Sequence, residues 1–462
     1  MTSDSSIDAD LLVIGWGKAG KTLARAHATA GERVVIVEAD PQMVGGTCIN
    51  IGCVPTKALV HRAAGRRDED AAGWFRSAQG FRTALTAKLR AANLAMVDDL
   101  DSSTVLIGTA RFVGDRTVEV ATADGTVTVR GTHVVVNTGS EPSFPPIEGL
   151  RASAYVVDST GVQLLGSLPE RLVVLGAGPI GLELADAFTR FGSQVTVVDV
   201  AERLLPREDE DVAASVRAAM EDAGTTFLLG ASARRVVDGD KAADLILDVA
   251  GPDGGAATER TLTAEAILVV TGRNPRTAEL DLEAGGIAVG ERGAITVDEH
   301  LRTSAEGVFA VGDVNGGPQF TYISYDDHRI VADQLRGGSS RSTEDRVAVP
   351  TTTFLTPPLA RVGLTEAEAT ERGIDVVVRS KPVAAIAAMP RPKAVEETHG
   401  LIKVLVEAGT DRIVGAALHT VDAQEVVNLL ALAMRHGITA SDLRDGIWTH
   451  PSSTEALNEV LA

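Results

Sequence analysis

The sequence predicts an α/β protein in which two nucleotide-binding units of the same design precede a separate α+β domain. A strand, a glycine motif, a helix, a second strand and a terminal acid occur twice at the same spacing. After residue 346 the pattern changes to strands and helices without such a motif. A chain of 462 residues is also too long for one hydrophobic core. We therefore expect domains at 1–148 with 271–345, at 149–270 and at 346–462.

The first unit begins with the apolar run 11–14, which is typical of a buried strand. Three glycines at GxGxxG spacing follow it: Gly15, Gly17 and Gly20. A helix is expected over 21–26, and a second strand, 33–37, ends on Glu38. Glycines let the backbone approach a pyrophosphate at a helix N-terminus, and the carboxylate accepts from ribose hydroxyls. Strand, helix and acid in this order favour a dinucleotide site over an ordinary glycine-rich turn.

The second unit repeats this design. The run 172–175 leads into another set of glycines: Gly176, Gly178 and Gly181. The strand 194–198 then ends on Asp199, and 23 residues separate the first glycine from the acid in both units. We therefore expect two Rossmann-like domains that bind two dinucleotides. Asp199 suits the free ribose of NADH and would repel the extra phosphate of NADPH, although Arg203 and Arg207 downstream leave NADPH possible.

Cys48 and Cys53 are the only cysteines of the chain. A disulfide that closes so short a loop removes little chain entropy, so we interpret the pair as redox-active rather than as a structural staple. Pro55 suits the first turn of a helix that continues over 57–64, and a helix N-terminus lowers a thiol pKa. Two inert buried cysteines, or half of a zinc site, are the alternatives. No further Cys or His pair stands nearby, so we expect no metal.

The net charge of −20 argues against nucleic acid or an anionic membrane as a partner, because either would require a basic surface. Residues 1–10 are acidic where a secretory signal would be basic, and no apolar run approaches the length of a membrane span. We therefore expect a cytoplasmic protein.

The remaining segments predict further elements. Apolar residues at helical spacing predict helices over 61–100: Phe81, Leu85, Leu89 and Leu94. Alternating residues over 105–136 predict strands, with a hairpin turn at Asp124 and Gly125. In the C-terminal domain we expect strands at 347–350 and 401–406 and a helix at 425–436.

Four polar residues outside the glycine motifs have both an ordinary and a functional interpretation. Asp313 follows a strand and a glycine, which is typical of a polar ligand site or equally of a turn. His450 stands five residues before Glu455, which could orient it as an acid–base pair, although most lone histidines are structural. Glu183, by itself, fits a charged helix surface.

Together these motifs resemble the FAD-dependent pyridine nucleotide–disulfide oxidoreductases, the family of glutathione reductase, lipoamide dehydrogenase and mercuric reductase. The resemblance implies that Cys53 faces the flavin and that Cys48 is the thiol that meets the substrate. It implies that Lys57 pairs with Glu183 beside the flavin. It further implies that the C-terminal domain is a dimerisation domain and that His450 and Glu455 reach the cysteines of the other subunit of a homodimer.

The same resemblance assigns the cofactor residues of one non-covalent FAD per subunit and of a nicotinamide nucleotide, with NADH preferred and NADPH possible. The FAD residues are Gly15, Gly17, Gly20, Glu38, Gly46, Thr47, Lys57, Ala110, Thr138, Gly139, Ser140 and Asp313. The NAD residues are Gly176, Gly178, Ile180, Gly181, Asp199 and Gly272.

Within the family, segments 15–24, 48–53 and 320–324 resemble the reactive-chlorine-resistance flavoproteins. These are implied to reduce hypothiocyanous acid and related small oxidants, and some are described as cupric reductases. The chain lacks a C-terminal cysteine pair, and Trp448 stands where lipoamide dehydrogenases usually have a second histidine. Dihydrolipoamide dehydrogenase, a mycothione- or glutathione-type disulfide reductase, a cupric or mercuric ion reductase, and a flavin-bound redox sensor stay open as alternatives.

Overall fold

The computed structural model describes residues 5–67, 70–251 and 256–462 and has an α/β fold, as the sequence predicts. The chain forms two compact units. Unit 1 contains Met1–Ala58, Gln79–Ser143 and Gly272–Arg346, and unit 2 contains Leu59–Ala78, Phe144–Thr271 and Val347–Ala462. The three-domain division stays a prediction.

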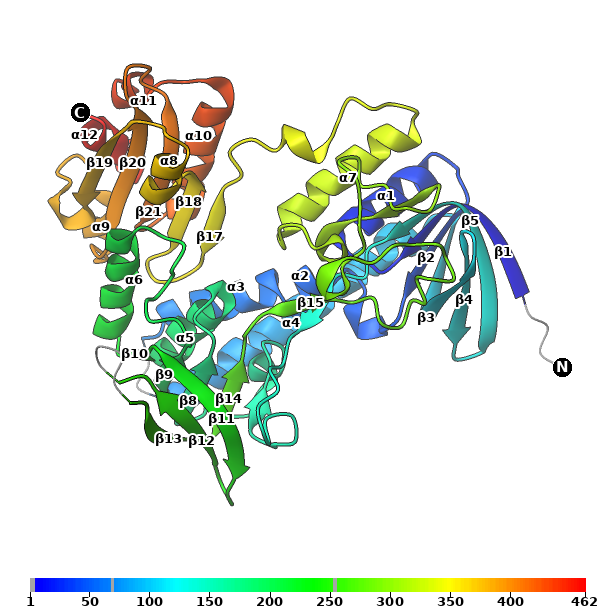
Figure 1. Ribbon diagram of the computed structural model, residues 1–462, viewed down its shortest axis with the longest axis horizontal. Coiled ribbons are helices and arrows are strands. Elements are labelled where there is room, and N and C mark those ends of the chain that lie inside the picture. Colours follow the sequence, from blue (N-terminus) through cyan, green and yellow to red (C-terminus); the bar gives the residue numbers. More distant parts are fainter. Residues whose placement is uncertain (1–4, 68–69, 252–255) are drawn as a thin grey trace. The chain divides into compact units, whose positions relative to one another are not determined.

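Unit 1 is built on a sheet of six strands (Figure 1). They are β1 (Ser5–Ile14), β2 (Val34–Glu38), β3 (Ser103–Gly114), β4 (Thr117–Thr122), β5 (Gly125–Val136) and β16 (Val308–Ala310). Strands β3, β2, β1, β5 and β16 pair in parallel, and β4 pairs antiparallel with β3 and β5. Strand β2 is buried along its whole length because hydrophobic residues cover both faces of the sheet. The β4–β5 turn confirms the predicted hairpin.

The helices of unit 1 place the site residues. They are α1 (Lys18–Thr29), α2 (Thr47–Asn50), α3 (Cys53–Ala64), α4 (Ala71–Asp98) and α7 (Thr321–Leu335), of which α3 and α4 continue into unit 2. Helix α1 packs against α7. Of the apolar residues predicted in α4, Phe81 is exposed and Leu85, Leu89 and Leu94 are half-buried. The fully buried side chains of this helix include both apolar and polar ones: Phe75, Ala78, Val97, Arg82 and Thr86. A short pair, β6 (Ser140–Pro142) and β15 (Arg273–Pro275), completes the unit.

The nucleotide-binding part of unit 2 repeats the parallel design. Its sheet has the order β10 (Thr226–Leu228), β9 (Gln194–Val198), β8 (Arg171–Leu175), β14 (Ala266–Val269) and β7 (Val156–Val157). Helices α5 (Pro179–Phe191) and α6 (Glu210–Asp222) accompany it. An antiparallel meander follows: β11 (Ala231–Asp238), β12 (Ala243–Val249) and β13 (Thr258–Ala264).

The C-terminal part of unit 2 is an antiparallel sheet with helices (Figure 1). The strand order is β17 (Thr351–Thr353), β18 (Leu359–Gly363), β21 (Ile413–His419), β20 (Leu401–Glu407) and β19 (Val376–Pro382). The helices are α8 (Glu366–Glu371), α9 (Arg391–Ala394), α10 (Ala423–His436), α11 (Ala440–Arg444) and α12 (Ala456–Val460).

Two of the three elements predicted in this part are confirmed. Strand β20 and helix α10 cover the predicted strand at 401–406 and helix at 425–436. The strand expected at 347–350 is wrong, because Ala348 adopts a φ of 51°, outside the extended region, and the strand begins at Thr351.

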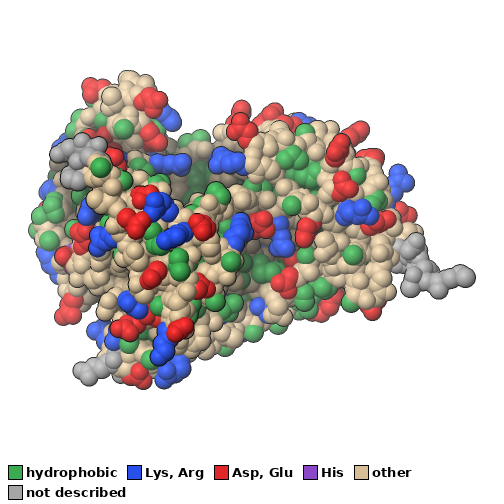
Figure 2. Space-filling model, turned by 60° about the horizontal axis from the view of Figure 1, so that its bottom comes forward, with side chains coloured by type: hydrophobic (Ala, Val, Ile, Leu, Met, Phe, Trp, Pro, Cys, Tyr) green, Lys and Arg blue, Asp and Glu red, His purple; other side chains and the backbone are tan. Residues whose placement is uncertain are grey.

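The surface carries mixed charge. In Figure 2, Lys and Arg side chains are interspersed with Asp and Glu side chains over the face in view. Among the described residues of this face, no broad basic surface of the kind that nucleic acid requires is visible. No helix in 5–67, 70–251 or 256–462 is both long and apolar enough to cross a membrane.

Candidate active site

The first glycine turn connects β1 to α1, and Glu38 at the end of β2 accepts a hydrogen bond from it. Gly15 has a φ of 92°, and a Cβ on Gly17 would lie 2.3 Å from the side-chain oxygen of Asn137, so larger residues are excluded. Glu38 accepts hydrogen bonds from the backbone N–H of Trp16 at 3.1 Å and of Asp40 at 3.2 Å. Burial raises the pKa of Glu38.

The second glycine turn has the same geometry. Gly176 has a φ of 111°, and Asp199 accepts from the backbone N–H of Ala177 at 2.7 Å and of Ala201 at 2.8 Å. A Cβ on Gly178, directly before α5, would meet no atom within 4 Å, so the turn is open on that side. A glycine turn before a helix N-terminus, with an acid at the neighbouring strand end, fits a dinucleotide at both places.

Asn137, at the end of β5, holds the first turn against the sheet, and the sequence interpretation missed it. Its side chain is buried, accepts from the Gly20 N–H at 2.8 Å and donates to the Val311 carbonyl at 2.7 Å. The signal in the sequence is a buried-strand residue with an amide directly before a small-residue loop. Its partners, 117 and 174 residues away, are visible only in the structure.

That small-residue loop lies next to the third predicted acid. The Ser140 hydroxyl donates to Asp313 at 2.7 Å, and Arg273 donates from Nε to the same hydroxyl at 2.8 Å. The Thr138 hydroxyl donates to the Arg276 carbonyl at 2.7 Å, and Gly139 has a φ of 72°. The structure thus brings Thr138, Gly139 and Ser140 together with Asp313 beside the carboxyl end of β16.

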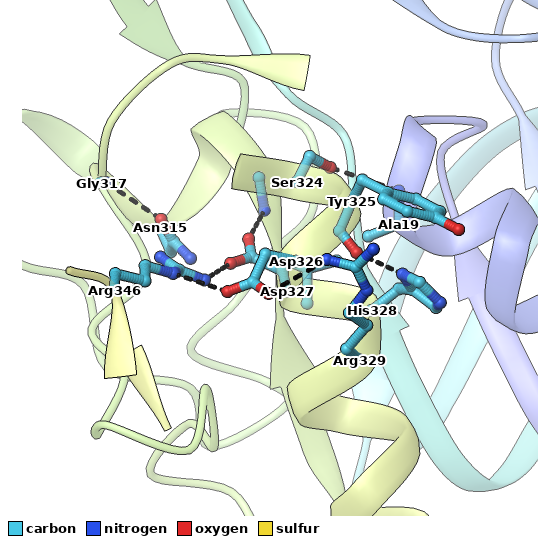
Figure 3. Close-up of polar contacts among 12 residues, drawn as sticks. Ala19, Asn315, Gly317, Ser324, Tyr325, Asp326, Asp327, His328, Arg329 and Arg346 are labelled. Atoms are coloured by element: carbon cyan, nitrogen blue, oxygen red, sulfur yellow. Dashed lines mark hydrogen bonds and ion pairs between the residues drawn. The ribbon is translucent and has the colours of Figure 1, made fainter. Parts of the chain in front are cut away.

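Helix α7 forms hydrogen bonds to the first glycine turn and to the loop that carries Asp313, as drawn in Figure 3. The Ser324 hydroxyl accepts from the backbone N–H of Ala19 at 3.2 Å. Asp327 is buried and accepts from the Gly312 N–H at 2.6 Å, next to Asp313. Arg346 pairs with Asp326 at 3.0 Å and with Asp327 (Figure 3). Burial raises the pKa of Asp327, so this ion pair compensates a desolvated carboxylate.

Cys48 lies in α2 and Cys53 is the first residue of α3. No disulfide joins them in this structure; Cys53 is exposed and Cys48 is half-buried. The Cys53 sulfur lies 3.5 Å from the hydroxyl oxygen of Thr321, the first residue of α7.

The expectation of a lowered thiol pKa is wrong for Cys48. The hydrogen bond with Cys53 and the burial of the sulfur both raise the pKa of Cys48, and they outweigh the lowering effects of Thr321 and Lys21. Two sulfurs this close titrate as a pair, so negative charge on one of them disfavours negative charge on the other.

The neighbours of the cysteines shape the access to them. Gly46 has a φ of 83°, and a Cβ there would lie 2.8 Å from the Trp16 carbonyl, so Thr47 starts α2 directly beside the first glycine turn. Phe320 and Tyr322 stack with ring centroids 5.1 Å apart on either side of Thr321. Lys57 follows Cys53 by four residues in α3 and is half-buried.

The predicted acid–base pair is formed in unit 2. The Nδ1 of His450 lies 2.9 Å from Glu455, which also accepts from the Ser452 N–H at 2.7 Å. The His450 side chain is 71% exposed, and the pairing lowers the pKa of Glu455. Glu455 thus orients the imidazole, which presents Nε2 to its surroundings. Trp448 donates to the Leu443 carbonyl at 3.2 Å and packs against the hydrophobic core of this part of the unit.

The other predicted residues lie in both units. Glu183 is buried in α5 and accepts from the Phe354 N–H at 2.9 Å; its pairing with Lys57, which belongs to unit 1, stays a prediction. Ala110 is buried in β3, Ile180 is exposed in the first turn of α5, and Gly272 has a φ of 135°. Their ligand contacts also stay predictions.

Two family models match the chain. The model described as pyridine nucleotide-disulphide oxidoreductase matches residues 9–327, and the dimerisation domain of the same family matches residues 349–461. The chain belongs to the pyridine nucleotide-disulphide oxidoreductase family. Membership makes it an oxidoreductase that uses a flavin and a pyridine nucleotide.

The relatives of this chain within the family include three enzymes of different names. The chain is 42% identical to the probable pyridine nucleotide-disulfide oxidoreductase RclA of Escherichia coli, over 98% of each chain. It is 36% identical to a mercuric reductase of Streptomyces lividans, over 97% of this chain and 94% of that one. It is 31% identical to a dihydrolipoyl dehydrogenase of Geobacillus stearothermophilus, over 99% and 97%.

Solved structures agree with the first relative. The HOCl-induced flavoprotein disulfide reductase RclA from Escherichia coli superposes with a TM-score of 0.91 at 42% identity, over 98% of this chain and 99% of that one. Its Cu(II) complex superposes with a TM-score of 0.91 at 41% identity, over the same shares. The chain is thus a flavoprotein disulfide reductase of the RclA type.

Proposed function

We propose that this protein passes electrons from NADH through FAD and the Cys48–Cys53 pair to a small oxidant, with hypothiocyanous acid as the first candidate. The observation that carries the proposal is the pair itself: two thiols in neighbouring helices, one of them exposed, beside a glycine turn of the nucleotide-binding type. The similarity to RclA, a protein induced by HOCl, supports a reactive chlorine species or its product as the oxidant.

The thiol step balances without any further reactant. The Cys48 thiolate attacks the sulfur of HOSCN, a Cys48–S–SCN bond forms, and hydroxide leaves. The Cys53 thiolate then attacks the Cys48 sulfur, which forms the disulfide and releases thiocyanate. FAD, when bound, carries the two electrons of the nicotinamide to this disulfide. The sum is NADH + HOSCN → NAD⁺ + SCN⁻ + H₂O.

His450 is proposed to protonate the departing hydroxide. Glu455 holds the Nδ1 side of the imidazole, so the exposed Nε2 is the atom that can deliver a proton. The match of 349–461 to a dimerisation domain supports a homodimer in which His450 serves the cysteines of the partner subunit.

A mixed-charge surface and the absence of a membrane-spanning helix among the described residues support a cytoplasmic location.

FAD is assigned to the turn of Gly15 and NADH to the turn of Gly176. The Gly15 turn adjoins Thr47 and the cysteines in one compact unit, so a dinucleotide held there by its pyrophosphate can extend toward the sulfurs. At the other turn Asp199 directly follows β9, at a position where a ribose 2′-phosphate would meet like charge.

Steady-state kinetics test the proposal. NADH consumption should be fast with hypothiocyanous acid, slow with oxidised glutathione, lipoamide and oxidised mycothiol, and absent in Cys48→Ser. A small oxidant needs no binding groove and reacts wherever a thiolate is accessible. The reverse ranking would assign the protein to the lipoamide or mycothione reductases. Bleaching of the flavin by NADH without turnover on any acceptor would indicate a redox sensor.

Reduction of Cu(II) is the second candidate. The observation that favours it is the Cu(II) complex of the 41% identical RclA structure. Two thiols are soft ligands that suit copper. NADH-dependent formation of Cu(I) that is faster than turnover with hypothiocyanous acid would favour the metal ion as substrate.

A further inference from the structure

Helix α1 contributes a buried lysine that the nucleotide-binding motif does not require. Lys21, directly after the last glycine, is only 5% exposed. No carboxylate among the described residues lies within ion-pair distance of its ammonium group. An uncompensated buried ammonium is costly, so an opposite charge close to Lys21 would stabilise its charged form.

The lysine is held by two oxygens close to the cysteines. Its Nζ donates to the carbonyl of Gly45 at 2.7 Å and to the side-chain oxygen of Asn93 in α4 at 2.7 Å. The Asn93 amide nitrogen donates to the Leu89 carbonyl at 2.8 Å, which turns the amide oxygen toward the lysine. Gly45 stands three residues before Cys48, so the ammonium is fastened to the turn that carries this thiol.

Among the charged groups that affect the pKa of Lys21, Cys48 is the one that raises it. Burial and the nearby Lys18 on the same helix lower the pKa of Lys21 to about 8, and Cys48 is the group that opposes them. In return, the charge of Lys21 lowers the pKa of Cys48. The Thr321 hydroxyl in α7 acts in the same direction, whereas Cys53 in α3 and burial raise this pKa. These directions agree with the geometry, in which the ammonium is hydrogen-bonded to Gly45, three residues before Cys48.

We infer that Lys21 is a positioning residue that acts as the counter-ion of the Cys48 thiolate. It fixes the Gly45 turn through the carbonyl and stabilises the negative charge that Cys48 carries when it attacks an oxidant. The inference rests on the proposed role of Cys48 as the attacking thiol. It does not depend on which oxidant is the substrate.

Alkylation of Cys48 tests the inference without any oxidant. In the FAD-loaded Cys53→Ser protein, Cys48 is the only thiol, so iodoacetamide labelling followed by mass spectrometry reports its thiolate fraction at each pH. Adding Lys21→Met should raise the apparent pKa of labelling by about one unit, which makes labelling about tenfold slower below that pKa. Lys21→Arg, which keeps the charge, should restore the rate to within about threefold of the Cys53→Ser parent.

Two further variants separate charge from structure. Lys21→Gln keeps a donor for Gly45 but is neutral; it should resemble Lys21→Met, and it replaces that variant if Lys21→Met does not fold. Lys18→Met removes a neighbouring charge of the same helix and should leave the labelling profile of Cys48 close to that of the parent. An unchanged profile in both neutral Lys21 variants, even with a lower melting temperature or less FAD, would overturn the inference. If the labelling profile of Cys48 shifts as expected but the protein reduces none of the tested oxidants, the inference about Lys21 stands. In that case only the proposed function fails.

Discussion

The two cysteines are unequal: Cys53 is exposed and begins a helix of twelve residues, whereas Cys48 is half-buried in a single turn. The N-terminal end of the longer helix favours negative charge on Cys53, and burial disfavours it on Cys48. The exposed sulfur of Cys53 therefore fits the role that the family resemblance assigns to it, a stable thiolate beside the flavin.

Replacing Cys53 should remove that thiolate. We expect anaerobic NADH to produce a long-wavelength absorbance band in the wild-type protein, because reduction of the disulfide frees a Cys53 thiolate next to the oxidised flavin. Cys48→Ser, which cannot form the disulfide, should show the band before NADH is added, and Cys53→Ser should not show it at all. Titration with NADH under nitrogen, followed by absorbance, measures this. A band that survives in Cys53→Ser, or a purified protein without flavin, contradicts the assignment.

His419, at the end of β21, should make the fold acid-sensitive. It is buried, its Nδ1 lies 2.9 Å from the Ser215 hydroxyl oxygen, and burial lowers its pKa to about 4. Between pH 4 and 6.5 the unfolded chain binds a proton that the folded chain does not, so stability is lost as the pH falls through this window, by up to about 3 kcal/mol. Urea unfolding at pH 7 and 4.5 should show a smaller loss in His419→Gln; an equal loss would exclude His419 as the cause.

The sequence predicts the role of a single residue where that role follows from its distance, along the chain, to other motif residues. The glycines, Glu38, Asp199 and the two cysteines stand at fixed distances along the chain, and the structure gives both acids the same pair of backbone partners. Asn137 and Lys21 were missed because their partners are distant in sequence: Val311 for the first, Asn93 for the second. A buried polar residue shows no periodic pattern of its own.

At the scale of elements, the second unit should select the nucleotide through the end of β9. Wild-type kcat/KM should favour NADH by roughly 5- to 150-fold, the effect of about 1–3 kcal/mol from one unfavourable phosphate contact with Asp199. Asp199→Gly should narrow that ratio mainly by raising kcat/KM for NADPH. A wild-type preference for NADPH would mean that Arg203 or Arg207 determines the choice.

A buried lysine links the N-terminus of α6 to strand β20. Lys403 is 2% exposed, and its ammonium lies 2.7 Å from Asp211 and 3.1 Å from Asp209 and also pairs with Glu366 in α8. Lys403→Met should cost about 3–5 kcal/mol of unfolding free energy, because it leaves carboxylates together without their cation. The exposed pair of Lys381 with Glu459 is the control.

In that control, Lys381→Met should cost less than about 1 kcal/mol, since the Lys381 side chain is 40% exposed and water screens the pair. Denaturant unfolding of both variants against the wild type measures the difference. Equal losses would show that the Lys403 cluster acts as an ordinary surface network.

Elements were predictable where hydrophobic periodicity or turn residues mark them. The two parallel sheets, the β4–β5 hairpin, β20 and α10 follow such signals. The strand expected at 347–350 failed because the backbone conformation of Ala348 is not encoded in its apolar side chain. Helix α4 exists as predicted, but it buries Arg82 and Thr86 as well as Phe75, Ala78 and Val97, so its buried face does not follow its apolar residues alone.

At the scale of the whole molecule, the site is expected to be complete only in a homodimer. The exposed imidazole of His450 and the cysteines belong to different units of one chain, and the family model of 349–461 is a dimerisation domain. A hybrid dimer of one Cys48→Ser chain and one His450→Ala chain should retain one working site of two. About half of wild-type turnover supports sharing across the interface; none at all would place both groups in the same chain.

The proposed reaction depends on thiol chemistry at Cys48, and the oxidised state of this thiol can be measured directly. NADH-reduced Cys53→Ser protein is mixed with one equivalent of hypothiocyanous acid, quenched in acid and analysed by mass spectrometry of the intact chain and its peptides. Without the resolving thiol, Cys48 should retain the Cys48–S–SCN adduct, while the wild-type protein should contain the Cys48–Cys53 disulfide and release one equivalent of thiocyanate. An unmodified Cys48 in the variant, with the oxidant still consumed at the wild-type rate, would contradict the account.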